Sequence, residues 1–266
     1  MDPKQQDKGK SVQKQALTAP PLVPAKTALA QLEGEETGFE STNSQDYSIP
    51  FLTLLQKGSP QCDDSKGGFV KEARPGMFFD AGSGELLDVV RVVPCHYSRK
   101  IVEWKSRESG GGFVAQHEPG EEETLPRNDK GVPYRENGNI LVDTRYFFCM
   151  RLNENNDSTP VIIAMSSTQT KKAKLWMSRM QAIKATGEGG KRFTPPMYSH
   201  VWKLTSVSEQ NDKGTWKGYK IELEGPITAG DLFRQAKDSR ELFRSTEVKP
   251  QALLTEYTED SSKSAM

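Results

Sequence analysis

From about residue 45 onward, apolar stretches of strand length alternate with segments rich in glycine, proline, asparagine and aspartate. Val, Ile and aromatic side chains dominate these stretches, and such residues favour extended strands. Asn, Asp and Gly tolerate the backbone of tight turns, so the NDKG sequence at 211–214 predicts a hairpin. The predicted strands are residues 85–105, with a bulge or boundary at Pro94, and residues 140–152, 160–165, 200–208 and 215–224.

The period of the apolar residues changes after the third of the main strands. Ala173, Trp176 and Met180 recur at helical spacing. Ser166 and Gln169 have the spacing of a capping box, which predicts that the helix begins there. The glycines at 187–190 predict its end.

This order of elements predicts a mainly β fold with one or two helices. A helix between the third and fourth strands is typical of the OB-fold, a small β-barrel that binds oligonucleotides. A β-sandwich with an inserted helix would give the same order of elements, so that alternative stays open.

The remaining segments define the expected domain organisation. Residues 1–42 have no sustained apolar periodicity, and we expect them to be disordered. Residues 43–228 form the OB-fold-like domain with its insertions, beginning with an extended lead-in and a short helix near 46–56. Residues 116–139 are charged and punctuated by glycine and proline, which predicts a long mobile connection. Residues 229–266 are expected to form a short helix followed by a flexible acidic tail.

Composition limits the class of protein. No apolar run approaches the ~20 residues that span a bilayer, and the N-terminus lacks the apolar segment of a secretory signal. We therefore expect no membrane association and a cytoplasmic location, in the host cell if the chain is viral. The chain has 36 basic and 36 acidic residues, but residues 91–220 hold 21 basic against 14 acidic ones. A basic middle between acidic ends suits a polyanionic partner, although ordinary charge scatter could also produce it.

Sequence signatures of catalysis are missing. The chain has three histidines, and HExxH, CxxC, Walker A and GxSxG motifs do not occur. We therefore expect a non-enzymatic protein that needs no cofactor and no metal. A divalent-metal nuclease is the enzymatic alternative, and incubation of labelled single strands with magnesium would test it.

Aromatic and basic residues are interleaved in three of the predicted strands and accompanied by lysines on the helix. Aromatic rings can stack unpaired bases, and Lys and Arg can contact phosphates, which is the chemistry of single-strand binding. The candidate nucleic-acid-binding residues are Tyr97, Arg99, Lys100, Trp104, Lys105, Arg107, Arg145, Tyr146, Lys171, Lys172, Lys174, Trp202, Lys203, Trp216, Lys217, Tyr219 and Lys220.

Strand geometry leaves two alternatives for these aromatic residues. Trp216 and Lys220 share one face of a strand, while Tyr219 and Ile221 share the other. If Trp216 points outward, it can stack a base while Tyr219 packs in the core, but the opposite phasing is equally compatible with the sequence. Independently of the phasing, all of these aromatic residues could lie in the core, and the lysines would then only make the surface soluble.

Two stretches resemble bacteriophage single-stranded DNA-binding proteins of the OB-fold type. They are MSSTQTKKAKLWMSRM at 165–180 and VWKLTSVSEQNDKGTWKGYKIELEG at 201–225, and the resemblance covers roughly residues 45–225. It implies a protein that coats and protects single-stranded DNA during replication or recombination. It also implies an acidic C-terminal tail that recruits replication or recombination proteins, which this chain matches only in part because Lys263 interrupts its acidic segment.

A second function remains open from the sequence. The protein could be a structural or adaptor protein of a viral particle, whose strands serve assembly. That hypothesis predicts stable oligomers in the absence of nucleic acid, whereas the first predicts binding to single strands with steep salt dependence.

Overall fold

The structure is a computed structural model that describes residues 36–42, 48–106, 109–212 and 214–245. The chain divides into two units, Met1–Asn43 and Ser44–Met266. In the first unit, residues 36–42 contain a turn in which the Thr42 N–H donates to the Phe39 carbonyl. Most of the segment expected to be disordered and the whole C-terminal tail, residues 246–266, lie outside the described residues.

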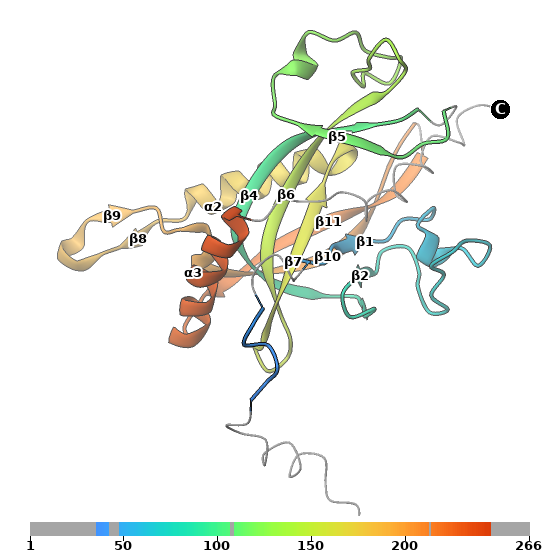
Figure 1. Cartoon of the computed structure of the whole chain (residues 1–266). Coiled ribbons are helices and arrows are strands. Elements are labelled where there is room, and N and C mark those ends of the chain that lie inside the picture. The colour runs from blue at the N-terminus through green and yellow to red at the C-terminus, as the bar shows by residue number, and fades with distance from the viewer. Residues whose placement is uncertain (1–35, 43–47, 107–108, 213, 246–266) are drawn as a thin grey trace, which may run out of the picture. The chain divides into compact units, whose positions relative to one another are not determined.

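Five long antiparallel strands form the main sheet, in the spatial order β11-β10-β4-β6-β7 (Figure 1). A shorter strand, β5, pairs with the second half of β4. The strands expected from the apolar pattern are confirmed. Their bounds are β4 Val90–Trp104, β6 Ile140–Leu152, β7 Ser158–Met165, β10 His200–Asn211 and β11 Gly214–Pro226, and β5 spans Phe113–His117, where no strand was expected.

Local chemistry explains two irregular features of this sheet. The register between β4 and β6 shifts between Pro94 and His96, as expected for a proline, which has no N–H to donate to a ladder. A tight turn joins β6 to β7, and its Asn153 N–H donates to the Asp157 carbonyl.

Two helices flank the sheet. Helix α2, Thr170–Ala182, follows the 3-10 turn η3 at Ser167–Gln169, and α3 spans Gly230–Ser245. The expected capping box does not form, because the Ser166 side chain makes no capping hydrogen bond. Helix α2 also ends before the glycines at 187–190, which instead form the turn of a small hairpin. This hairpin pairs β8, Ala185–Thr186, with β9, Arg192–Phe193.

Each face of the main sheet is covered, so its central strands are buried on both sides. On one face Ala173, Trp176 and Met180 of α2 pack in a cluster with side chains that include Phe147. On the other face Leu232, Ala236 and Phe243 of α3 pack in a second cluster with side chains that include Phe148. Strand β6 is therefore almost continuously buried. Helix α3 follows the expected domain boundary at residue 228, but its apolar side chains are part of the core.

A second, three-stranded sheet lies at the start of this unit. Its strands are β1 Leu52–Leu54, β2 Phe78–Asp80 and β3 Leu86–Leu87. The prediction of a short helix near residues 46–56 is wrong, because Leu52 and Leu54 pair with β2 and Phe51 bridges to Ile162 of β7. Other one-turn 3-10 helices are η1 Pro60–Cys62, η2 Glu121–Glu123, η4 Glu188–Gly190 and η5 Met197–Ser199.

The connection at residues 116–139 is folded, which corrects the expectation of a long mobile loop. It is anchored on Glu103 of β4, a carboxylate that is only 5% exposed. Asn139 Nδ2 lies 2.6 Å, His117 Nε2 2.7 Å and Arg135 Nε 3.0 Å from the oxygens of Glu103. A buried charge is tolerated only when such partners satisfy it, so this carboxylate fixes the connection to the sheet.

The main sheet is open, with β7 and β11 as its edges. Two glutamine side chains satisfy the edge of β11. Gln56 accepts from the Lys217 N–H at 2.9 Å and donates to its carbonyl at 3.0 Å, and Gln169 donates to the same carbonyl and accepts from the Tyr219 N–H. The fold class is confirmed as mainly β with two helices, and the open sheet is consistent with a barrel-like or a sandwich arrangement. No helix in the described ranges is long and apolar enough to cross a membrane.

Candidate nucleic-acid interface

Four of the candidate aromatic residues, Trp104, Tyr146, Trp202 and Tyr219, lie in the core. Each is at most 4% exposed. Trp202 packs edge-on against Trp176 at a centroid distance of 6.1 Å, and Tyr219 lies 5.8 Å from Phe78. Stacking on a base requires an open ring face, so burial removes these four side chains from the candidate interface.

Tyr97 and Trp216 keep part of their rings exposed. Tyr97 packs edge-to-face on Phe147 at 5.2 Å, and its pKa is raised, chiefly by burial. Trp216 lies on the β10–β11 hairpin, where its indole N–H donates to Glu209 at 2.9 Å. These two rings remain as stacking candidates.

Several of the predicted cations are already paired with carboxylates. Arg99 bonds to Asp143 at 2.9 Å and to Glu122 at 3.2 Å, and Arg145 contacts the same aspartate at 3.0 Å. Lys100 pairs with Glu118, and Lys220 with Glu222. A phosphate must compete with these carboxylates, so the paired cations contribute less than their number suggests.

Helix α2 carries cations without acidic neighbours on the helix itself. Lys171, Lys172, Lys174 and Arg179 lie in a helix that contains no Asp or Glu. Lys171 and Lys174 are exposed, and no carboxylate in the described part of the chain pairs with either of them. Lys172 instead contacts Glu209 at 2.7 Å.

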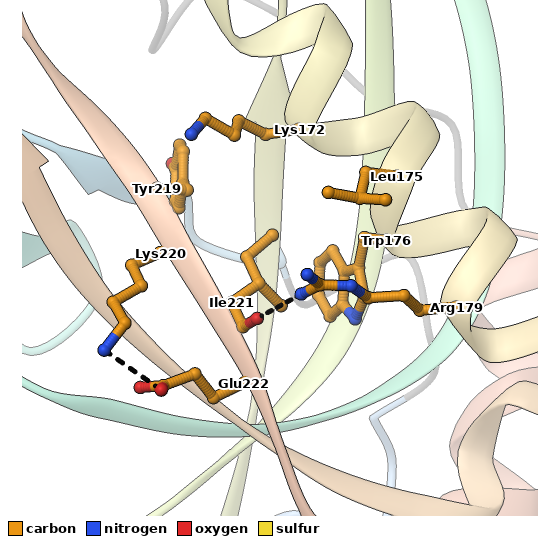
Figure 2. A pocket seen from close by; sticks show the side chains of 8 residues that line it. All are labelled: Lys172, Leu175, Trp176, Arg179, Tyr219, Lys220, Ile221 and Glu222. Carbon is orange, nitrogen blue, oxygen red and sulfur yellow. Dashed lines mark hydrogen bonds and ion pairs between the residues drawn. The ribbon is translucent and has the colours of Figure 1, made fainter. Parts of the chain in front are cut away.

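A shallow pocket of about 230 Å³ separates α2 from β11 (Figure 2). Arg179 crosses it and donates to the Ile221 carbonyl at 2.8 Å. Lys172 and Leu175 line the helix side, and Lys220 lies on the strand side. Three cations line the pocket, and Lys220 pairs with the one carboxylate of the lining, Glu222; Leu175, Trp176 and Ile221 supply its apolar part.

The start of α2 connects the pocket to the tip of the β10–β11 hairpin. Glu209 receives both Lys172 and the Trp216 indole, and Lys217 Nζ donates to the Ser208 hydroxyl at 2.9 Å. On the other side, Arg145 reaches the Thr170 hydroxyl at 3.4 Å. We use the name α2 surface for the cations of α2 together with two residues of the adjoining strand β11: Lys171, Lys172, Lys174, Arg179, Trp216 and Lys217.

The other candidates are not part of the α2 surface. Lys105 is exposed beyond the end of β4, and Lys203 lies on β10 opposite Glu222. Arg107 lies outside the described residues. Among those residues, no cluster of His, Cys, Asp or Glu has a geometry suited to a metal ion.

Sequence reasoning left one basic element out of the candidate list. Residues 166–195 hold seven Lys or Arg against a single acidic residue, Glu188. Besides α2, this stretch forms the β8–β9 hairpin, with Lys191 and Arg192 exposed. The excess of Lys and Arg in this stretch was the signal that could have identified the hairpin as basic. The glycines of its turn were interpreted only as the end of the helix.

Comparison with known proteins gives one match. A family model described as Pam3 phage gp34-like protein matches residues 13–249 of the 266. No curated protein and no solved structure matches the chain.

Proposed function

Because the chain belongs to the Pam3 phage gp34-like protein family, we propose that this bacteriophage protein binds and protects single-stranded DNA without catalysing a reaction. It would act during replication or recombination in the infected cell, and its C-terminal tail would recruit proteins of those processes. The observation that carries the proposal is the α2 surface, where Lys172 and the partly exposed Trp216 contact the same carboxylate, Glu209, and the same helix carries the exposed Lys171 and Lys174.

The electrostatic support comes from Lys171 and Lys174. A cation that contacts a phosphate releases counterions from the strand, which favours binding and makes it dependent on salt. Because these two lysines have no carboxylate partner among the described residues, they gain a phosphate contact without breaking an ion pair.

The aromatic support comes from Trp216. Its ring is held in place by the hydrogen bond to Glu209, a carboxylate that also contacts Lys172, and is partly exposed. A fixed ring loses little conformational entropy when a base stacks on it, and each such contact contributes about 1–3 kcal/mol. A ring next to cations suits a single strand better than a duplex, whose bases are already stacked.

The decisive experiment is a fluorescence titration with matched single-stranded and double-stranded oligonucleotides at two salt concentrations. Trp104, Trp176 and Trp202 are buried, so quenching by a single strand should come from Trp216. We expect tighter binding to the single strand, weaker binding at higher salt, and loss of the quenching in Trp216→Phe.

Two results would overturn the proposal. One is a single-strand affinity no higher than that for the duplex. The other is stable high-order assembly without nucleic acid, measured by size exclusion with light scattering, together with no detectable strand binding. The second result would favour a structural or adaptor role in the viral particle.

A further inference from the structure

The β8–β9 hairpin projects beyond the end of α2, away from the main sheet (Figure 1). Only two residue pairs form its ladder, Ala185 with Phe193 and Thr186 with Arg192. Two-stranded hairpins of this size are marginally stable alone. Among residues 184–194, all except Ala185 and Gly187 are exposed, so the hairpin adds almost nothing to the core.

Phe193 is exposed although it belongs to this hairpin. Phe193 is 47% exposed, and its partner in the ladder is the small side chain of Ala185. The ring lies near Gly187, where an added Cβ would be 3.5 Å from it. An exposed ring on a peripheral hairpin is accessible to a planar partner such as an unpaired base.

The charge around Phe193 indicates what kind of partner this is. Lys191 and Arg192 are its neighbours in the chain, and in the described ranges neither has a carboxylate partner. Glu188 is the only acidic residue of the hairpin. An aromatic ring that follows two unpaired cations in the chain is complementary to an unpaired base with its adjoining phosphates.

The base of the hairpin is fixed to α2. Lys184 Nζ donates to the Gln181 carbonyl at the end of the helix and to the Thr194 hydroxyl just after β9. Ile183, between helix and hairpin, packs against the core cluster that contains Trp176. The hairpin is therefore held as a continuation of α2.

We infer that the β8–β9 hairpin is a second contact site for the single strand, in which Phe193 stacks on a base while Lys191 and Arg192 contact the adjoining phosphates. The inference rests on the proposed function and extends the α2 surface by a separate element. The strand would run along α2 and then onto the hairpin.

The test measures the anisotropy of a labelled oligothymidylate of about 20 nucleotides, longer than the ~4–16 that one OB-type domain covers. Phe193→Ala should weaken binding by about fivefold to a hundredfold and leave the salt dependence unchanged, because stacking releases no counterions. The double variant Lys191→Gln, Arg192→Gln should lower the slope of log K against log salt by about 1.4.

Phe69→Ala is the matched control, because Phe69 is similarly exposed, at 43%, in a loop far along the chain from the hairpin. Phe193→Trp keeps a ring at the site and should retain affinity while giving a new emission that the oligonucleotide quenches. This variant also shows whether weak binding of Phe193→Ala results from loss of the ring or from loss of the hairpin.

The possible failures are distinguishable. If the wild type binds the oligonucleotide but Phe193→Ala matches Phe69→Ala and Phe193→Trp is not quenched, the hairpin inference is overturned and the proposed function stands. If the wild type does not bind the single strand, both are overturned.

Discussion

Neutralising the two unpaired lysines of α2 is the most direct test of the α2 surface. In the double variant Lys171→Gln, Lys174→Gln both positions remain exposed and helical, and Gln has nearly the helix propensity of Lys. Folding should be unaffected, since neither side chain pairs with a carboxylate among the described residues. Any change in binding then reports on the strand.

The magnitude follows from counterion release. Each phosphate contact to a single strand contributes about 0.7 to the slope of log K against log salt. Two lost contacts reduce the slope by about 1.4, which corresponds to about 25-fold weaker binding at roughly 0.1 M salt, or about 2 kcal/mol. The difference between variant and wild type should shrink as salt approaches ~1 M.

The assay is an anisotropy titration across a salt series from about 0.05 to 0.2 M. The control replaces two exposed lysines elsewhere, Lys71→Gln and Lys237→Gln, which removes the same total charge. Equal slopes for the two double variants would show that net charge alone governs binding, and that no strand follows α2.

Three further changes test other contacts. Glu209→Gln removes the carboxylate that holds Lys172, so single-strand affinity at low salt should rise by about fivefold in the same titration, and weaker binding would contradict this role. Glu103→Gln should lower the free energy of unfolding by about 2–3 kcal/mol in urea, because it weakens a hydrogen-bonded buried charge. Burial raises the pKa of Glu103, but the hydrogen bonds from its three partners lower that pKa by a larger amount. The net pKa of Glu103 is therefore below the ordinary 4.5. The stabilisation is therefore present above pH 4.5, and the difference between wild type and variant should shrink as the pH falls through the lowered pKa. Tyr146→Phe removes a buried hydroxyl that has no hydrogen-bond partner in the described part of the chain, so thermal denaturation should show a gain of about 1 kcal/mol rather than a loss.

The long strands and both helices could be predicted because their signals are local. Strand β6 is rich in β-forming residues such as Ile140, Val142 and Phe147, and a turn of Asn, Asp and Gly separates β10 from β11. Strand β1 could not be predicted in this way. Its residues Leu52–Leu54 form a strand because β2 pairs with them, and that partner lies more than twenty positions along the chain.

The candidate site was harder to predict because alternation along a strand identifies a solvent face only when one face is open. In β6, Tyr146 and Phe147 point to opposite faces, and both are fully buried because α2 and α3 cover the two sides. Trp202 and Tyr219 are buried in the same α2-side cluster. The lysines of α2 could be identified, since helical spacing separates them from Ala173, Trp176 and Met180 without knowledge of the rest of the fold.

The glutamine contacts on β11 determine whether another strand can pair with this edge of the main sheet. A primary amide presents the same donor and acceptor as a peptide group, so Gln56 and Gln169 occupy places that a neighbouring chain would otherwise take. A strand of a second copy therefore cannot pair with β11 at Lys217 and Tyr219 without displacing these glutamines. Side chains rather than a backbone ladder make these contacts to β11. They can therefore break at the cost of a few hydrogen bonds, while the hydrogen-bonded ladders between the strands stay intact.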